Sequence, residues 1–138
     1  MDSDPKAVVK RFYDGVYPTW KPEALDEVIA SNFRGHAGAG ADLPQLKESI
    51  ASFKGAFPDL DVDVVHLVRE GDMVSAWVTY TGTHQGEFAG VSGSGRDIKI
   101  AGWDLFRVEN GKVAELTQYC DLFTLMNQIG ALPTAAPA

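Results

Sequence analysis

Apolar side chains recur every three or four positions near the start of the chain, which is the spacing of one helix face. Ser3 or Asp4 can cap such a helix, Pro5 suits its first turn, and Pro18 ends it. We therefore predict a helix over residues 5–17. Its buried face consists of Val8, Val9, Phe12, Tyr13 and Val16.

Further helices are predicted before and after a central run of strands. Residues 22–29 and 43–56 carry apolar positions at helical spacing, and residues 121–129 look like a short terminal helix that ends at Gly130. Glycine recurs within residues 32–42, so we interpret that segment as a loop.

The centre of the chain alternates apolar and polar residues, as strands do when one face is buried. Residues 60–70, 73–83, 98–108 and 113–120 are predicted strands, and residues 86–95 form a connection rich in glycine and serine. Helices followed by consecutive strands indicate an α+β domain, in which a curved antiparallel sheet packs against about three N-terminal helices. Such a sheet encloses an apolar pocket, the usual geometry of a ligand site. The predicted pocket residues are Phe12, Phe33, Phe53, Phe88, Phe106 and Leu116.

Composition narrows the classes of partner. The chain has 138 residues, enough for one domain that buries about two thirds of its unfolded surface. Its net charge of −7, without any run of lysine or arginine, argues against nucleic acid or an anionic membrane as a partner. The single cysteine, Cys120, excludes an intrachain disulfide and a zinc cluster, so we predict no metal site. No signal peptide is visible and no apolar run approaches ~18 residues, so we expect a cytoplasmic protein.

Asp104 is the most informative polar residue, because it interrupts an apolar strand face. Side chains alternate along a strand, so Asp104 shares a face with Phe106 and Val108. Burying a carboxylate costs several kcal/mol unless it is paired, hydrogen-bonded or protonated. An inward Asp104 therefore indicates either a structural hydrogen-bond network or an active site, and both interpretations stay open at this point.

The turn after this strand decides which residue Asp104 faces. A two-residue Asn-Gly loop would pair Val108 with Val113 and place Asp104 on the face of Thr117. A turn in which the glycine forms a bulge would instead pair Val108 with Lys112.

We favour the bulge, because it directs Leu116 inward and Glu115 and Thr117 to solvent. Asp104 and Gln118 then converge on one interior.

Two histidines are further candidates. His36 stands in the glycine-rich segment, where it is either an exposed loop residue or an acid, base or hydrogen-bond partner of Asp104 at the pocket mouth. His84 follows a strand and is better explained as a residue that stabilises a turn.

Six motifs follow one another over about residues 7–130 and together resemble a known family. They are Phe33 with His36 and Gly40, AFPD at 56–59, EGDMV at 70–74, GTHQGEFAG at 82–90, FRVENGKV at 106–113 and NQIG at 127–130. The set resembles the SnoaL-like polyketide cyclases, within the cone-shaped nuclear-transport-factor-2-like superfamily. This implies one SnoaL-like domain over residues 1–130, followed by a tail over residues 131–138 that we expect to be loose.

The resemblance implies chemistry on a hydrophobic, polyketide-like small molecule, without a metal or an organic cofactor. In the cyclases of this family, a carboxylate removes an acidic proton flanked by carbonyl groups, and the enolate closes a ring by an intramolecular aldol step. Donors near the carbonyl oxygen stabilise the developing charge. A role in polyketide or antibiotic biosynthesis follows as an expectation.

This chain departs from the cyclase pattern at two positions. Gln118 stands where the cyclases carry the aspartate base, and Asp104 stands where they carry its companion histidine. Relatives with an aspartate at the Asp104 position are associated with hydroxylation of anthracycline-type substrates, and they pair it with an arginine where this chain has Gln118. We predict Asp104 as the acid or base, with Gln118 and His36 orienting the substrate.

Alternative functions on the same scaffold remain open. One is an enzyme of hydroxylation, epoxide opening or isomerisation, although Arg107 lies on the strand face opposite Asp104 and so does not complete the Asp–Arg set of epoxide hydrolases. The other is a non-catalytic ligand-binding module, in which Asp104 and Gln118 only satisfy each other.

The resemblance also implies a homodimer, or a homotetramer, joined through the outer face of the sheet. Trp77, Trp103 and Tyr119 are predicted on that face, and an exposed aromatic patch is a liability for a lone monomer.

Overall fold

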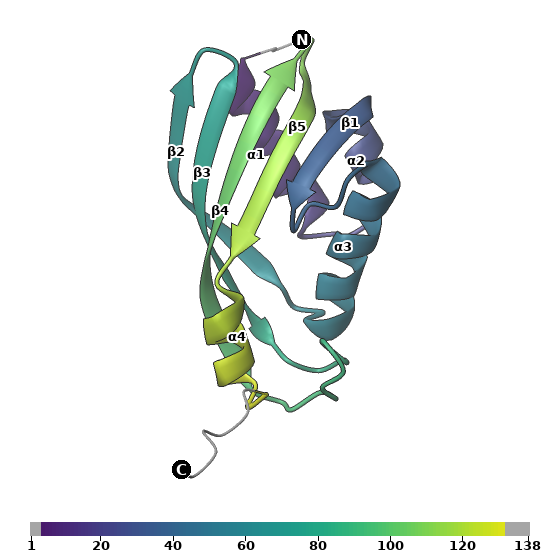
Figure 1. The fold of residues 1–138 in the computed structure, drawn as a ribbon, viewed down its shortest axis with the longest axis vertical. Coiled ribbons are helices and arrows are strands. Elements are labelled where there is room, and N and C mark those ends of the chain that lie inside the picture. Colours follow the sequence, from purple (N-terminus) through teal and green to yellow (C-terminus); the bar gives the residue numbers. More distant parts are fainter. Residues whose placement is uncertain (1–3, 132–138) are drawn as a thin grey trace.

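A curved, unclosed sheet of five strands carries the fold, and the first three helices lie along one side of it (Figure 1). The computed structural model describes residues 4–131. The strand order across the sheet is β1-β5-β4-β3-β2, so the predicted α+β class is confirmed. The strands are β1 (Ile29–Ala37), β2 (Asp61–Glu70), β3 (Met73–Thr83), β4 (Asp97–Glu109) and β5 (Lys112–Cys120). The helices are α1 (Pro5–Val16), α2 (Ala24–Val28), α3 (Leu43–Ala56) and α4 (Leu122–Gln128).

The helices begin where the sequence provides caps. The Asp4 side chain accepts a hydrogen bond from the backbone amide of Lys6 at the start of α1, and Asp42 does the same for Gln45 in α3. The alternative cap, Ser3, and the predicted tail from residue 132 onward lie outside the described residues. The second helix is shorter than predicted, because Ile29 already begins β1. No helix within residues 4–131 is long and apolar enough to cross a membrane.

The predicted loop over residues 32–42 was wrong in its first half, because β1 runs to Ala37. This strand pairs with β5 in the parallel direction, so the sheet is mixed rather than wholly antiparallel. Only Ile29 and Phe33 are buried along β1, and the glycines lower its local preference for a strand. Its backbone partners come from a distant segment, which explains why a local pattern did not identify it.

The turn between β4 and β5 has the register that we did not favour. Val108 pairs with Val113 and not with Lys112, and both residues of the Asn-Gly loop have positive φ. A bulge is nevertheless present, a few residues further along β5. Ala114 is the extra residue, and it is buried together with its neighbour Val113.

The bulge at Ala114 restores the predicted pairing between the inward residues of β4 and β5. Beyond it, Phe106 pairs with Leu116, and Asp104 pairs with Gln118. The predicted convergence of Asp104 and Gln118 is therefore confirmed, although the bulge that produces it lies in the strand and not in the turn.

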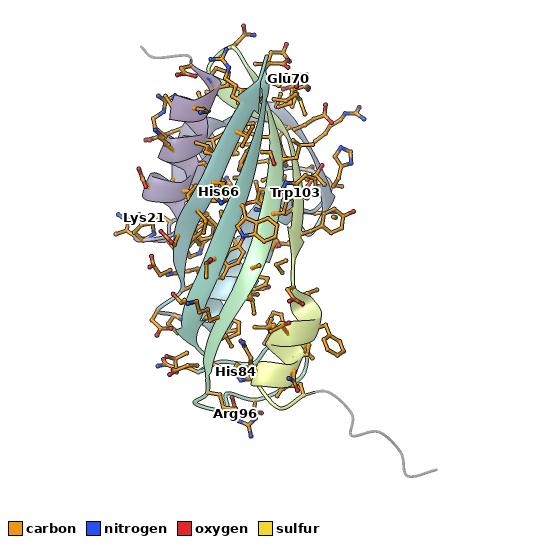
Figure 2. All side chains as sticks on the ribbon, turned by 90° about the vertical axis from the view of Figure 1, so that its left-hand side faces the viewer. Lys21, His66, Glu70, His84, Arg96 and Trp103 are labelled. Atoms are coloured by element: carbon orange, nitrogen blue, oxygen red, sulfur yellow. The ribbon has the colours of Figure 1, made fainter. Side chains whose placement is uncertain are left out.

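The two faces of the sheet differ in character. The inner face packs with α1, α2 and α3 into an apolar core. The outer face carries exposed aromatic side chains, as predicted: Trp77 is 50% exposed, Trp103 36% and Tyr119 58%. Figure 2 shows Trp103 on this outer face, which α1 leaves uncovered.

The close packing of Gly35 in β1 against the backbone of Gly40 can be tested by substitution. A Cβ atom at Gly35 would collide with the backbone oxygen of Gly40, so Gly35→Ala should lower the free energy of unfolding by about 2 kcal/mol. Gly55→Ala is the matched control, because a Cβ atom there meets nothing within 4 Å, and it should raise stability by about 0.5–1 kcal/mol. Urea unfolding measures both, and an equal effect of the two substitutions would contradict the packing described.

Candidate active site

A small pocket of about 50 Å³, partly open to solvent, lies between α3 and the ends of β3 and β5. Its walls are mostly apolar, with hydroxyl, amide and thiol groups among them. The lining residues are Tyr17, Gly38, Ser49, Ile50, Phe53, Leu60, Tyr80, Gln118, Tyr119 and Cys120.

The structure places most of the predicted pocket residues in the core instead. Of the six, only Phe53 lines this pocket. The others that fill the core are Phe12, Phe33, Phe106 and Leu116. Phe88 packs beside Phe53, with the ring centres 5.3 Å apart. The physical reason is that α1 lies against the sheet and fills the other part of the concave face, where Phe12 meets Phe106 at 5.4 Å.

Asp104 is fully buried on the inner face of β4. The hydroxyl group of Tyr13, from α1, donates a hydrogen bond to its Oδ2 atom. Burial raises the pKa of Asp104 to about 7, and this effect outweighs the opposite influence of the Tyr13 hydrogen bond and of the nearby Gln118 amide, which lower the pKa. The carboxyl group is therefore able to give or take a proton near neutral pH.

Gln118 connects Asp104 with the pocket. It pairs with Asp104 across β4 and β5, and its own side chain lines the pocket. The amide is near enough to lower the pKa of Asp104, yet the two side chains do not reach hydrogen-bonding geometry. Among the described residues, Asp104 Oδ1 and Gln118 Nε2 are buried without a hydrogen-bond partner.

Two further tyrosines, Tyr17 and Tyr80, line the pocket near Asp104. Burial raises the pKa of Tyr17 and of Tyr80, so both hydroxyl groups stay protonated and act as hydrogen-bond donors. The ring of Tyr80 lies over Gly102, where a Cβ atom would collide with it. Glycine at this position thus leaves the space that Tyr80 occupies beside Asp104.

Sequence reasoning missed the roles of Tyr13 and Tyr17. Tyr13 was assigned to the apolar face of the first helix, and Tyr17 lay at its end. The available signal was chemical, because a buried tyrosine hydroxyl needs a partner. The inward carboxyl group of Asp104 is a suitable partner for the hydroxyl group of Tyr13. Only the docking of α1 on the sheet brings the two side chains together.

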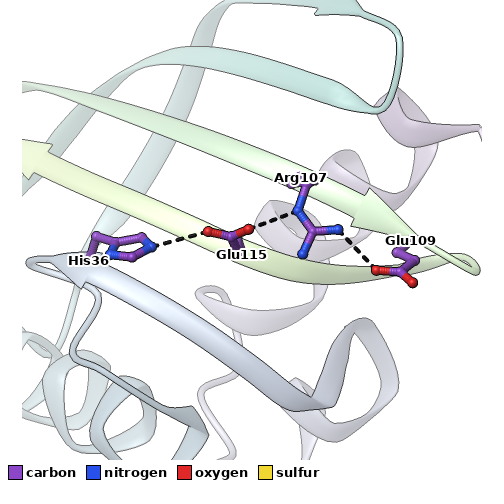
Figure 3. Close-up of polar contacts among 4 residues, drawn as sticks. All are labelled: His36, Arg107, Glu109 and Glu115. Carbon is purple, nitrogen blue, oxygen red and sulfur yellow. Dashed lines mark hydrogen bonds and ion pairs between the residues drawn. The ribbon is translucent and has the colours of Figure 1, made fainter.

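His36 does not join this group, because it lies on the outer side of β1. Figure 3 shows its ring beside Glu115, with 3.1 Å between His36 Nε2 and Glu115 Oε2. Arg107 bonds Glu115 at 2.8 Å and Glu109 at 2.9 Å. The structure therefore separates His36 from Asp104, and Arg107 lies on the face opposite Asp104, as alternation predicted.

His84 has a structural environment. It is fully buried, its Nδ1 atom lies 2.8 Å from the hydroxyl oxygen of Ser94, and the backbone amide of Ser94 donates to the same nitrogen at 3.2 Å. These contacts hold the connection before β4, as the turn interpretation predicted. Within residues 4–131, no cluster of three or more His, Cys, Asp or Glu side chains is arranged to hold a metal ion.

Comparisons with known proteins agree on one family. A family model described as SnoaL-like polyketide cyclase matches residues 7–129. A search of the curated proteins found no match.

Solved structures with the same fold cover almost the whole chain. TsrD from Streptomyces laurentii is 27% identical, with a TM-score of 0.83 over 96% of this chain and 99% of that chain. A provisionally named SnoaL-like polyketide cyclase from Jannaschia sp. CCS1 is 28% identical, with a TM-score of 0.82 over 94% and 93%. AclR from Streptomyces galilaeus, provisionally named a hydroxylase, is 24% identical with a TM-score of 0.85 over 97% and 85%, which establishes a shared fold alone.

The raised pKa of Asp104 predicts a pH-dependent cost to stability. The folded protein binds this proton more tightly than the unfolded chain, so stability is greatest below about pH 4 and is lost as the pH rises towards about 7. Between pH 5 and pH 8 the loss from Asp104 should approach 3 kcal/mol, at roughly 1.4 kcal/mol per pKa unit. Asp104→Asn should remove that loss.

Urea unfolding at pH 5 and pH 8 measures this difference. The control is Asp61→Asn, at an exposed position of β2, which should follow the wild type. An Asp104→Asn protein with the pH dependence of the wild type would show that the buried carboxyl does not titrate in this range.

Proposed function

The chain belongs to the SnoaL-like polyketide cyclase family, and on that basis we propose that it is a cofactor-independent enzyme acting on a polyketide-like small molecule. The proposed reaction is an acid/base-catalysed cyclisation of the intramolecular aldol type, or a related tailoring step. The observation that carries the proposal is that the fully buried Asp104 pairs across the sheet with Gln118, a half-buried residue that lines an apolar pocket.

Asp104 supplies the proton-transfer group. A catalytic acid or base works best when its pKa lies near the working pH, and burial brings the pKa of Asp104 to about 7. The hydrogen bond from Tyr13 fixes one carboxyl oxygen and leaves the other for the reaction. Tyr13 is thus a positioning residue.

Gln118 has a different role, because an amide does not take up a proton at neutral pH. Its N–H group can donate to a carbonyl oxygen that becomes negative as the enolate forms. The apolar walls formed by Ile50, Phe53 and Leu60 exclude water and strengthen such a hydrogen bond. They also suit a hydrophobic substrate. His36 has no part in this proposal, because its side chain lies on the outer side of the sheet.

A second candidate function is a ligand-binding protein without turnover. The observation that favours it is that Asp104 itself is absent from the pocket wall, so a substrate reaches it only if the side chains in front of it move. The two functions differ in whether a bound ligand undergoes proton exchange.

We also propose that two copies of the chain associate through their outer sheet faces. Trp103 and Tyr119 stack there with ring centres 6.2 Å apart, and Trp77 pairs with Trp103 across β3 and β4. Together with the 63% exposed Val68, they form an apolar patch across the sheet. A second copy buries both patches in one symmetric contact.

The enzymatic proposal predicts catalysed exchange of an acidic C–H proton. An aromatic ester with a methylene group between two carbonyls serves as the probe, and NMR in deuterated water follows the exchange. Asp104→Asn should lower the exchange rate constant by at least about 100-fold, the usual contribution of a catalytic acid or base. His36→Ala should stay within about two-fold of the wild type, because His36 does not touch the pocket.

Full exchange activity in Asp104→Asn would remove Asp104 from the mechanism. Saturable binding of the probe without any catalysed exchange would favour the ligand-binding function instead.

The dimer proposal predicts that a charge in the patch dissociates the protein. Trp103→Lys should weaken self-association by at least about ten-fold, as expected when a central aromatic contact is replaced by a charge. Sedimentation velocity over a concentration series gives the dissociation constant. Phe123→Lys is the control, because Phe123 is 73% exposed on α4, outside the patch. Equal weakening by both substitutions, or a wild-type monomer, would exclude this interface.

A further inference from the structure

Two unsatisfied polar atoms lie on directly paired residues of the sheet. Asp104 Oδ1 and Gln118 Nε2 are both buried, and neither has a hydrogen-bond partner among the described residues. Buried polar groups without a partner cost free energy and are rare in native proteins. Their occurrence together, beside a pocket, indicates that a ligand atom completes the hydrogen bonding.

The environment of the pair determines which atoms the ligand meets. Tyr13 already donates to Oδ2 of Asp104, so Oδ1 is the oxygen that remains. Gln118 lines the pocket and lies opposite Asp104, so its amide is the point at which a ligand enters the pair.

The two atoms have opposite hydrogen-bonding roles. Ionised Oδ1 accepts a hydrogen bond, and the Gln118 N–H donates one. A hydroxyl oxygen satisfies both, because it donates to Oδ1 and accepts from Nε2. A ketone or ether oxygen accepts only, and it leaves the carboxylate without a partner.

We infer that the Asp104–Gln118 pair binds its substrate through a hydroxyl or enol group, carried on a flat apolar body. This deepens the proposed function and rests on it. The body fits the remaining walls, because Phe53, Ile50 and Leu60 offer apolar surface and Tyr17 and Tyr80 offer aromatic rings. The pocket holds about 50 Å³, so a ligand of one or two rings enters only as its walls move apart.

Three naphthalene probes of similar shape test the inference by isothermal titration calorimetry at pH 8.5, where Asp104 is ionised. 2-Naphthol donates and accepts, whereas 2-methoxynaphthalene and methyl 2-naphthyl ketone accept only. The wild type should bind 2-naphthol at least ten-fold more tightly than either other probe, because a hydrogen bond to a charged group is among the strong ones.

Substitutions at the two residues of the pair should have different effects on probe binding. In Asp104→Asn, the amide oxygen keeps the bond from Tyr13, so an N–H donor takes the place of Oδ1. The preference should then shift by at least ten-fold towards the ketone. Gln118→Met keeps the length of the side chain and removes the donor, so binding of all three probes should weaken. His36→Ala is the control, because His36 lies on the outer side of the sheet and bonds Glu115 there, and it should keep the wild-type order.

Equal binding of the alcohol and the ether by the wild type overturns the inference. So does an unchanged preference in Asp104→Asn that is shown by circular dichroism to be folded. Loss of C–H exchange in Asp104→Asn without any hydroxyl preference leaves the proposed enzyme standing and removes only this inference. A preference for the hydroxyl probe without C–H exchange activity supports the binding inference and removes the proposed enzymatic reaction.

Discussion

The burial of one carboxyl group is the constraint on which the site depends. Asp104 is enclosed in an apolar interior, and its neighbours compensate for only part of the cost. Tyr13 satisfies one oxygen, while the other has no partner within the described chain. A group held in this way has its pKa moved to where proton transfer is possible, and it remains able to gain from a ligand.

Several features of the fold serve that constraint. The bulge at Ala114 sets the register that brings Gln118 opposite Asp104. Glycine at position 102 leaves room for the ring of Tyr80, which lines the pocket. Tyr13, within α1, and Tyr17, just after its end at Val16, both belong to the core, and Tyr17 also lines the pocket. One end of the concave face is thus packed as core, and the other is left as a pocket.

The favoured turn register was wrong at Val108, yet Asp104 still pairs with Gln118, because the extra residue lies in the strand. A hydrophobic pattern fixes which side chains are inward, and a bulge can be moved along a strand at little cost to that pattern. The same pattern could not separate core phenylalanines from pocket phenylalanines, because both kinds are apolar and inward. Phe106 and Phe53 differ only in what packs against them.

The sequence by itself determined the α+β class, the four strands from β2 to β5, the inward direction of Asp104 and the outward direction of Trp103. These follow from local periodicity, since the spacing of apolar residues dictates which face of an element is buried. Only the tertiary structure decided that β1 is a strand, that Tyr13 is the partner of Asp104, and that His36 lies on the far side of the sheet. Each of these depends on contacts between segments far apart in the chain, and no local spacing encodes which distant residue will supply the partner.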